Sequence, residues 1–363
     1  IYQGWYFNMS GKLYIAAAGS GKTRKIIEDS LNTHKKVLVL TYTITNEQQI
    51  ISRIKNKVGI IPNNITVSTW FSFLLKDGIR PYQGSRFKER IEGIIFVNGQ
   101  NNTYVKKTSN KYFAKDNRIY TDKLSECVIE LNDNCNGKVF ERISGMYDCI
   151  YVDEVQDMVG YDLEILKCLI ASRTEVIMVG DPRQCTYSTH SSKKYKKYSC
   201  GKIDEFLKNE CRKLDVRIDE TTLNCTYRNN DIICNFANSL YPERAHTNFV
   251  RKAEDDSDGV MIIDKADVEK YLQKFNAMQL RENKNISVNT EYPYYNFGES
   301  KGLEFQRVLI YPTQPMWDWI INNSSSLKEQ SKAKLYVAVT RAEDSVVIVR
   351  KDARPCSLPV VKL

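Results

Sequence analysis

The chain has 363 residues, of which 42% are hydrophobic and 27% are charged, and no stretch of it approaches the length of a membrane span. We therefore expect two ordinary domains with hydrophobic cores and no membrane partner. Lys and Arg number 53 against 44 Asp and Glu, a formal net charge of +9, which favours a polyanionic partner such as a nucleic acid.

The cysteines and histidines of the sequence argue against a zinc site and against catalysis by histidine. The ten cysteines form no C-x-x-C pair and several lie in apolar runs, so we interpret them as buried free thiols of a reducing compartment. The three histidines are scattered along the sequence, so neither imidazole-led catalysis nor zinc binding is expected. The N-terminal residues show no export signal, which predicts a cytoplasmic protein.

The first motif in the chain is "YIAAAGSGKTRK", residues 14–25. An apolar run leads into a glycine-containing loop and a helix-compatible segment follows, which is the order of a P-loop. Glycines let backbone N–H groups approach phosphate oxygens, and a helix N-terminus favours an anion. Lys22 is expected to reach the β- and γ-phosphates of ATP, and Thr23 to hold Mg²⁺. The alternative is a glycine turn followed by a surface lysine. The predicted nucleotide-binding segment is Gly19, Ser20, Gly21, Lys22, Thr23 and Arg24.

Short apolar, β-branched runs recur along the chain with helix-length segments between them. They begin at residues 12, 36, 64, 149, 175, 307 and 345. This spacing predicts parallel sheets with crossover helices, an α/β fold. Residues 77–146 are polar, lysine-rich and aromatic without that alternation, and we interpret them as an inserted subdomain. A second irregular zone covers residues 241–295.

Two of these runs end in polar residues. The segment "CIYVDEVQD", residues 149–157, places Asp153 and Glu154 at the end of an apolar run, where the carboxyl ends of parallel strands meet a bound nucleotide. Asp153 is expected to complete the Mg²⁺ shell begun by Thr23, and Glu154 to take a proton from the attacking water. The alternative is an ordinary acidic strand end. The run at 175 continues into "GDPRQCTY", which contains Gln184.

The P-loop, the acidic strand end and the glutamine-bearing loop resemble, in this order, motifs I, II and III of superfamily 1 helicases of the UvrD/Rep type. The later chain agrees with this resemblance, which covers most of residues 12–349. The matching segments are 37–50 (motif Ia), 68–75 (the T-F-H-S segment), 223–238 (motif IV), 299–312 (motif V) and 335–349 (motif VI).

The resemblance implies a fold of two RecA-like P-loop lobes with parallel sheets and a small insertion in the first lobe. The implied bounds are 9–215 for the first lobe with its insertion at about 77–146, 216–352 for the second lobe, and 353–363 for a tail.

The resemblance also implies roles for matching residues in binding and hydrolysing ATP. Gln184 would act with the P-loop and the carboxylates from the first lobe. Arg228 and Arg341 would reach the γ-phosphate from the second lobe, where planar guanidinium groups stabilise the transition-state charge. Either arginine could instead form a surface ion pair. Tyr227 would stack on adenine, or could be a core ring, and Glu304 would accept a hydrogen bond from the ribose, with Gly302 beside it.

The sequence departs from the family pattern mainly where nucleic acid would bind. The family's Y-x-W after motif III is Tyr187-Ser188-Thr189 here, and the histidine of motif V is lost between residues 296 and 302. Stacking contributes about 1–3 kcal/mol per base, so another ring must serve. No glutamine motif precedes the P-loop, so other nucleoside triphosphates could be accepted. The candidate rings, each of which could instead be core, are Tyr42, Trp70, Phe71 and Tyr187.

Two basic segments interleave Lys with Tyr or Phe, as single-strand binding requires. They are residues 191–202, "SSKKYKKYSCGK", and residues 103–115. The alternative for both segments is a solvated lysine face. Residues 191–202 are the stronger candidate for DNA binding, because they lie just after motif III. The predicted contacts are Lys193, Lys194, Lys196 and Lys197.

The resemblance implies an ATP-dependent DNA translocase or helicase that acts on single-stranded DNA in the 3′ to 5′ direction. The interval from 238 to 296 is too short for the large second-lobe insertion of familiar members, which predicts a minimal motor. The alternative is a DNA-stimulated ATPase switch that regulates a nuclease-containing partner, as in bacterial antiphage systems. The tail after residue 352 is too short to hold a nuclease.

Overall fold

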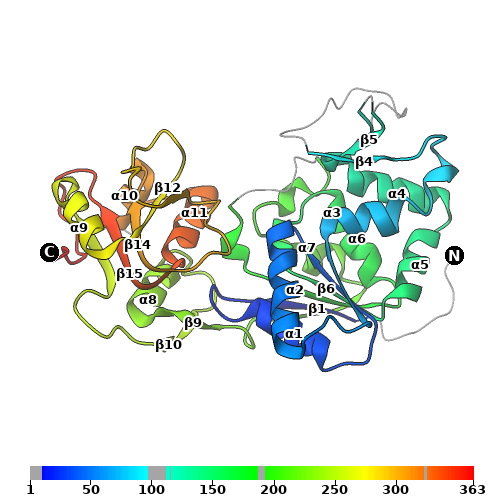
Figure 1. Cartoon of the computed structure of the whole chain (residues 1–363), viewed down its shortest axis with the longest axis horizontal. Coiled ribbons are helices and arrows are strands. Elements are labelled where there is room, and N and C mark those ends of the chain that lie inside the picture. The colour runs from blue at the N-terminus through cyan, green and yellow to red at the C-terminus, as the bar shows by residue number, and fades with distance from the viewer. Residues whose placement is uncertain (1–9, 97–111, 115, 187–192, 323–324) are drawn as a thin grey trace. The chain divides into compact units, whose positions relative to one another are not determined.

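The computed structural model describes residues 10–96, 112–114, 116–186, 193–322 and 325–363 (Figure 1). By its internal contacts the chain divides into two compact units. Unit 1 contains the described residues of Ile1–Ile15, Lys22–Gly180 and Ser188–Asp219, and unit 2 those of Ala16–Gly21, Asp181–Tyr187 and Glu220–Leu363. The lobe boundaries given by the resemblance stay predictions.

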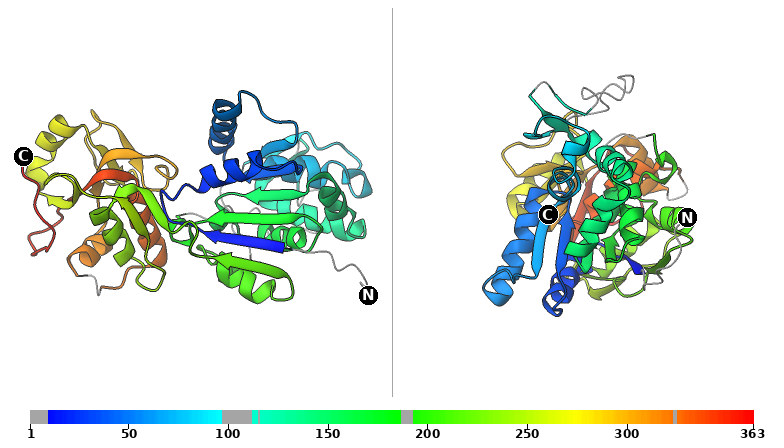
Figure 2. Two further views of the ribbon diagram at one scale, coloured as in Figure 1. Left: turned by 90° about the horizontal axis from the view of Figure 1, so that it is seen from below. Right: turned by 90° about the vertical axis from the view of Figure 1, so that its right-hand side faces the viewer.

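Unit 1 is built on a six-stranded sheet in which every neighbouring pair is parallel, in the order β3-β2-β6-β7-β1-β8. In the left view of Figure 2 the blue β1 lies among the green strands of this sheet. The α/β class is therefore confirmed, and the five runs expected at 12, 36, 64, 149 and 175 are strands. The strands are β1 (Ser10–Ile15), β2 (Val37–Thr41), β3 (Ile65–Thr69), β6 (Cys149–Val152), β7 (Glu175–Gly180) and β8 (Asp215–Asp219).

Helices connect these strands, and the sequence marks where they begin and end. Thr43 caps the N-terminus of α2 by accepting a hydrogen bond from the Asn46 amide at 3.1 Å, and Gly59 follows the helix at φ 82°. The main helices of the unit are α1 (Lys22–Leu31), α2 (Ile44–Val58), α3 (Trp70–Phe73), α4 (Leu124–Asn134), α5 (Lys138–Met146), α6 (Tyr161–Ile170) and α7 (Ile203–Glu210).

Residues 77–146 are more regular than the sequence analysis expects. β4 (Gly93–Ile95) and β5 (Arg118–Tyr120) form a separate two-stranded sheet, but α4 and α5 pack into the core of unit 1 (Figure 1). The buried side chains of α4 follow helical spacing, which the polar residues before them conceal. The expectation that this whole segment lacks alternating elements is therefore wrong for its last third. The buried residues of α4 are Leu124, Ser125, Cys127, Val128 and Leu131.

Unit 2 has a five-stranded parallel sheet in the order β11-β15-β14-β12-β13, and β9 and β10 form a separate parallel pair. The runs expected at 307 and 345 are β14 and β15, whereas β10 to β13 lie in or beside the zone expected to be irregular. The strands are β9 (Cys225–Asn230), β10 (Asn248–Arg251), β11 (Gly259–Ile263), β12 (Met278–Arg281), β13 (Tyr294–Asn296), β14 (Phe305–Tyr311) and β15 (Ala342–Val349).

Four helices of the described residues belong to unit 2, and the C-terminal residues join the edge of its sheet. Ile262 of β11 donates to the Pro359 carbonyl at 2.9 Å and accepts from the Val361 amide at 2.9 Å. The helices are α8 (Asp231–Ser239), α9 (Val268–Phe275), α10 (Gln314–Ile321) and α11 (Glu329–Val339). Short turns are η1 (Leu74–Ile79), which is π-helical, and the 3-10 turns η2 (Gln83–Ser85), η4 (Thr121–Lys123), η5 (Val155–Asp157), η6 (Pro182–Gln184), η7 (Lys196–Tyr198) and η8 (Lys265–Asp267).

None of the helices in the described part of the chain combines the length and the apolar character of a membrane-spanning segment. All ten cysteines carry free thiols. Within the same described ranges, no three His, Cys, Asp or Glu side chains are grouped as a metal site.

Gly78 gives a test of how residues 77–146 join the core. A Cβ atom at Gly78 would lie 2.7 Å from Cγ2 of Val128 on α4, so we expect Gly78→Ala to lower the free energy of unfolding by about 1–3 kcal/mol. Gly145 of α5 has open space around its Cα, so Gly145→Ala is the matched control and should stabilise the helix by up to about 1 kcal/mol. Urea unfolding of both variants measures the difference. Adding Val128→Ala to Gly78→Ala should restore part of the lost unfolding free energy, because it removes the colliding methyl groups. Wild-type stability of Gly78→Ala alone would contradict the packing of Gly78 against Val128.

Candidate functional site

The loop after β1 has the backbone that a phosphate cradle requires. Gly19 and Gly21 adopt φ of 71° and 84°, in the left-handed region that favours glycine. The Ser20 amide donates to the Ala17 carbonyl at 3.2 Å, and α1 begins at Lys22. The Ser20 hydroxyl is buried and has no hydrogen-bond partner among the described residues. A buried polar group without a partner is costly, so this loop fits a polar ligand.

Gly19 is also required by its neighbours. A Cβ atom at this position would lie 2.6 Å from Cβ of Arg228 and 2.7 Å from Oγ1 of Thr226, both on β9. The Gly19 carbonyl accepts a hydrogen bond from the Tyr227 amide at 3.0 Å. The loop and β9 are therefore in direct contact, which brings Tyr227 and Arg228 beside the predicted phosphate cradle.

Asp153 directly follows β6 and is only 3% exposed. Its two carboxylate oxygens accept from the Glu154 amide at 2.9 Å and from the Thr23 hydroxyl at 3.4 Å. Burial, together with the neighbouring Glu154 carboxylate, raises the pKa of Asp153 to about 7, and the positive charge of Lys22 opposes this rise. A divalent cation at Thr23 and Asp153 would offset the cost of the buried charge, so these residues fit Mg²⁺, which takes few protein ligands beside substrate phosphates.

Glu154 is held in an unusual conformation. Its φ is 55°, in the left-handed region that non-glycine residues seldom adopt, and such strain occurs at functional sites. The Gln156 amide donates a hydrogen bond to the Glu154 carboxylate, and Gln156 is itself buried. A Cβ atom at Gly180, the last residue of β7, would collide with Gln156. The sequence analysis missed this support, although Gln156 lies inside the quoted motif.

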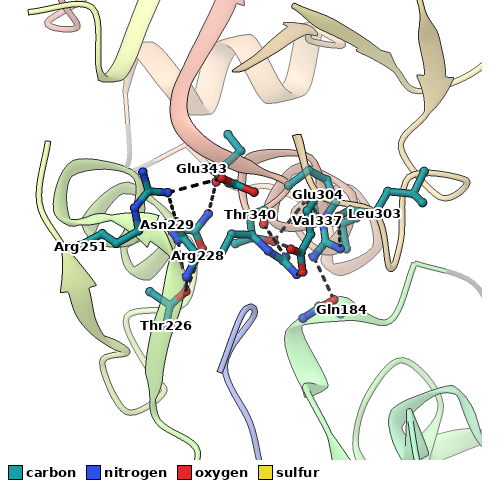
Figure 3. Close-up of polar contacts among 12 residues, drawn as sticks. Gln184, Thr226, Arg228, Asn229, Arg251, Leu303, Glu304, Val337, Thr340 and Glu343 are labelled. Atoms are coloured by element: carbon teal, nitrogen blue, oxygen red, sulfur yellow. Dashed lines mark hydrogen bonds and ion pairs between the residues drawn. The ribbon is translucent and has the colours of Figure 1, made fainter. Parts of the chain in front are cut away.

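In unit 2, the loop after β7 arranges Gln184 around a buried carboxylate. Asp181 is fully buried and accepts hydrogen bonds from Arg183 Nε at 2.8 Å, Gln184 Nε2 at 2.9 Å and the Tyr336 hydroxyl at 3.1 Å. The Gln184 carbonyl oxygen accepts from Arg341 Nη2 at 3.3 Å (Figure 3). Gln184 therefore connects Asp181 to Arg341, and the contact of Tyr336 with Asp181 is one that the sequence analysis did not identify.

Arg341 lies between α11 and β15 and is 2% exposed. It donates to the carbonyl oxygens of Val337 at 3.1 Å and Leu303 at 3.2 Å, and to the Thr340 hydroxyl at 3.3 Å. These three acceptors fix the guanidinium in the interior. The alternative of a surface ion pair is therefore wrong for Arg341.

Arg228 reaches Thr340 from β9. Its Nη1 donates to the Thr340 carbonyl at 2.9 Å, and its Nη2 forms an ion pair with the Glu304 carboxylate (Figure 3). Its Nε is buried and has no hydrogen-bond partner in the part of the chain that the structure describes. Arg228, a predicted ligand of the γ-phosphate, and Glu304, the predicted ligand of the ribose, are thus paired with each other. Gly302 lies two residues before Glu304 and adopts φ 87°.

Two further predicted nucleotide ligands are exposed. The Tyr227 side chain is 60% exposed, so the alternative of a core ring is wrong. Arg24, in the first turn of α1, pairs with Glu28 at 3.2 Å and is 70% exposed. Their roles toward a nucleotide, like those of the other site residues, stay predictions.

The aromatic candidates for nucleic acid differ in exposure. Trp70 is fully buried and donates from Nε1 to Asp162 at 2.9 Å, so its ring is part of the core and no base can stack on it, which corrects its place among the candidates. Tyr42 and Phe71 are half-buried and meet edge to face with their centroids 6.0 Å apart. Tyr187 lies outside the described residues.

The lysines after motif III differ in their exposure and in their ion pairs. Lys193, Lys196 and Lys197 are exposed, and Lys197 also pairs with Glu210 at 3.3 Å. Lys194 is half-buried and pairs with Glu164 at 3.2 Å. The tyrosines between them, Tyr195 and Tyr198, pack on the buried ring of Phe206. Tyr198 is buried, so the interpretation that it stacks on a base is wrong, whereas Tyr195 is half-buried and its stacking on a base stays a prediction.

Comparison with protein families gives one match. Residues 97–196 match the model of the UvrD/REP helicase N-terminal domain. This stretch contains the Asp153 and Gln184 motifs, and the resemblance to UvrD/Rep helicases is confirmed over it. No curated protein matches the chain in sequence.

Three solved structures are similar to the chain over 94% of its length. They are arterivirus nonstructural protein 10 (helicase), with a TM-score of 0.47 and 14% identity, the same protein in complex with DNA, with 0.48 and 14%, and the PRRSV helicase, with 0.45 and 13%. The chain covers 59%, 60% and 53% of these three chains, so it spans less than two thirds of their lengths.

Alanine substitutions at Gly59 and Gly19 distinguish the cost of backbone strain from the cost of a steric collision with β9. Gly59 adopts φ 82° and a Cβ atom there would have nothing within 4 Å, so Gly59→Ala should cost about 1–2 kcal/mol of unfolding free energy from strain alone. Gly19→Ala adds the collision with Arg228 and should cost about 1–3 kcal/mol more. Chemical denaturation of both variants measures this difference. Equal losses would show that Gly19 does not pack against β9.

Proposed function

We propose that the chain is an ATP-dependent translocase or helicase that acts on single-stranded DNA in the 3′ to 5′ direction. The observation that carries this proposal is the gathering of predicted nucleotide residues from distant parts of the sequence. Gln184, Arg228 and Arg341 meet around Thr340 through hydrogen bonds, and Glu304 joins them through Arg228. The match to the UvrD/REP helicase N-terminal domain supports the same activity.

In this proposal each site residue has one task toward ATP. The backbone N–H groups from Gly19 to Gly21 and the Lys22 ammonium hold the phosphates. Thr23 and Asp153 hold Mg²⁺, which supplies Lewis-acid stabilisation of charge on the phosphate oxygens when bound. Glu154 accepts the proton of the attacking water, and the Gln156 amide keeps its carboxylate oriented.

The two arginines stabilise the charge that spreads over the γ-phosphate during transfer. Arg341 is held by two carbonyl oxygens and a hydroxyl, which orient its planar guanidinium. Arg228 is paired with Glu304, so it has to exchange this partner for a phosphate oxygen, while Glu304 turns to the ribose. ATP-dependent engagement of these arginines would couple hydrolysis to movement along the strand.

Single-stranded DNA is the proposed polymer because partly exposed rings and exposed cations occur at the surface of unit 1. Tyr42 and Phe71 offer stacking, and Lys193 and Lys196 offer phosphate contacts. The rival proposal is a DNA-stimulated ATPase switch with a nuclease-containing protein partner. The lost tryptophan after motif III and the short interval before motif V favour that rival.

One pair of assays with the purified chain distinguishes the proposals. ATP hydrolysis is measured with and without single-stranded DNA, and duplex displacement is measured on substrates with a 3′ or a 5′ single-stranded tail. Stimulation with displacement from the 3′-tailed substrate supports the helicase. Stimulation without displacement supports the switch, and hydrolysis that DNA does not affect contradicts both.

Substitutions at Lys22 and Glu154 should affect different steps, ATP binding for Lys22 and hydrolysis for Glu154. Lys22→Ala removes the charge that holds the β- and γ-phosphates, so both ATP binding and hydrolysis should be lost. Glu154→Gln keeps the hydrogen bond with Gln156 possible but cannot accept a proton, so binding should stay within a few-fold of wild type while turnover falls by about 10²–10⁴. Equilibrium binding of a fluorescent ATP analogue and steady-state turnover separate the two. Equal loss of binding in both variants would show that Glu154 is not the base.

Arg341 tests whether unit 2 takes part in hydrolysis. Arg341→Lys keeps a positive charge at the buried position but loses the planar fork, and turnover should fall by about 10³-fold or more with ATP binding retained. The control is Arg354→Ala in the tail, an exposed arginine whose partners are the half-buried Asp318 and Asp352. Melting curves confirm folding of both variants. Wild-type turnover by Arg341→Lys would contradict the proposed role.

A further inference from the structure

A buried carboxylate outside the nucleotide residues lies beneath the aromatic surface of unit 1. Asp162 is fully buried in the first turn of α6. It accepts hydrogen bonds from Trp70 Nε1 at 2.9 Å, from the Tyr42 hydroxyl at 3.0 Å and from the Ser125 hydroxyl. Burying a carboxylate is costly unless donors surround it, so three donors on one group indicate a site that the fold maintains.

The sheet explains why these donors meet at Asp162. β2 and β3 are parallel neighbours and their last residues, Thr41 and Thr69, are paired in register. Tyr42 and Trp70 are the residues that follow, so both leave the same edge of the sheet at the same level. α6 follows the loop that carries Asp153 and Glu154 after β6, the other neighbour of β2.

The two oxygens of Asp162 serve different purposes. Oδ1 accepts from the core side chains Trp70 and Ser125, and Oδ2 accepts from the half-buried Tyr42. The carboxylate is thus fixed from the interior and holds the Tyr42 ring by its hydroxyl. Hydrogen bonds to a charged group are about twice as strong as neutral ones, so the orientation of the ring is strongly restricted.

Tyr42 begins a row of rings that reaches the surface. Its ring meets Phe71 edge to face, and Phe71 meets Phe96 in the same manner with centroids 6.0 Å apart. The Phe96 side chain is 73% exposed. A row of rings that runs from half-buried Tyr42 and Phe71 to exposed Phe96 suits unpaired bases, which stack on any ring, and Tyr42 is its inner end.

We propose that Asp162 is a positioning residue for single-stranded DNA, because it fixes the Tyr42 ring at the orientation in which a base stacks on the Tyr42–Phe71 edge. The inference rests on the proposed function, since it names a residue that serves the same DNA-binding activity. Asp162 itself touches no DNA. Its effect on the strand passes entirely through the Tyr42 hydroxyl.

A double-mutant cycle tests this route. Tyr42→Phe keeps the ring but loses the hydroxyl, and Asp162→Asn weakens the same contact from the other side. Each is expected to weaken binding of a fluorescent oligothymidine by about 3- to 10-fold, because a ring that Asp162 no longer holds has to be ordered when a base stacks on it. The double variant should bind no more weakly than the weaker single variant. The salt dependence of binding should match wild type, because no phosphate contact is lost.

The control perturbs Asp162 on its interior oxygen. Ser125→Ala removes one donor to Oδ1 and leaves the hydrogen bond between Tyr42 and Oδ2 in place. It should lower the melting temperature and keep oligothymidine affinity within about 2-fold of wild type, which a general packing defect would not do. Trp70 does not serve as a control, because its ring centroid lies 6.3 Å from that of Tyr42. In Asp162→Asn, the DNA concentration for half-maximal ATPase stimulation should rise while DNA-free turnover stays at the wild-type value.

The outcomes separate failure of this inference from failure of the proposed function. If wild type neither binds oligothymidine nor responds to it, the proposed function fails. If wild type binds but Tyr42→Phe and Asp162→Asn bind equally well, the inference is wrong. Multiplying effects in the double variant, or an equal loss of affinity in Ser125→Ala, would also overturn it, because Asp162 would then act through general stability.

Discussion

The parallel sheet of unit 1 is the constraint on which its candidate site depends. Parallel strands end at one edge, so residues that follow different strands become neighbours there. The register pairs Leu40 with Val152, and Val152 with Met178, which brings the ends of β2, β6 and β7 to one level. β1 joins the same edge through the pairing of Ile15 with Gly180. The P-loop, Tyr42, the acidic turn and the loop of Gln184 therefore all leave the sheet at one side.

Several carboxylates are buried after these strands, and the partners of three of them, Asp153, Asp162 and Asp181, decide what each of the three can do. Asp181 has the Arg183 guanidinium at 2.8 Å, so its charge is compensated within the chain. Asp162 accepts from three uncharged donors on its two oxygens. Asp153 accepts from a hydroxyl and a backbone amide, and burial raises its pKa. A cation would gain most at Asp153, which agrees with its place beside Thr23.

The sequence predicts those parts of the molecule whose physics is local. The glycines of the P-loop and the acidic strand end follow from backbone geometry and charge within a few residues, and the seven apolar runs are strands because each is buried in a sheet. The burial of Trp70 could not be predicted, because it depends on Asp162, which lies 92 residues away. The pairing of Arg228 with Glu304 could not be predicted for the same reason, because the two residues are 76 positions apart in the sequence. The helical spacing in α4 is present in the sequence, but the polar segment before it conceals the signal.

The two arginines of unit 2 have the same predicted role, but their side chains are held by different kinds of partner. Arg341 is buried and held by the carbonyl oxygens of Val337 and Leu303, so its position is fixed by the fold. Arg228, whose side chain is 11% exposed, is held by the Thr340 carbonyl and by Glu304, whose own side chain is 52% exposed. Glu304 can therefore turn toward solvent and release Nη2 of Arg228, whereas the acceptors of Arg341 belong to the interior. In the proposed function, Arg228 would be the arginine that changes partner when a nucleotide binds, and Arg341 would keep its place.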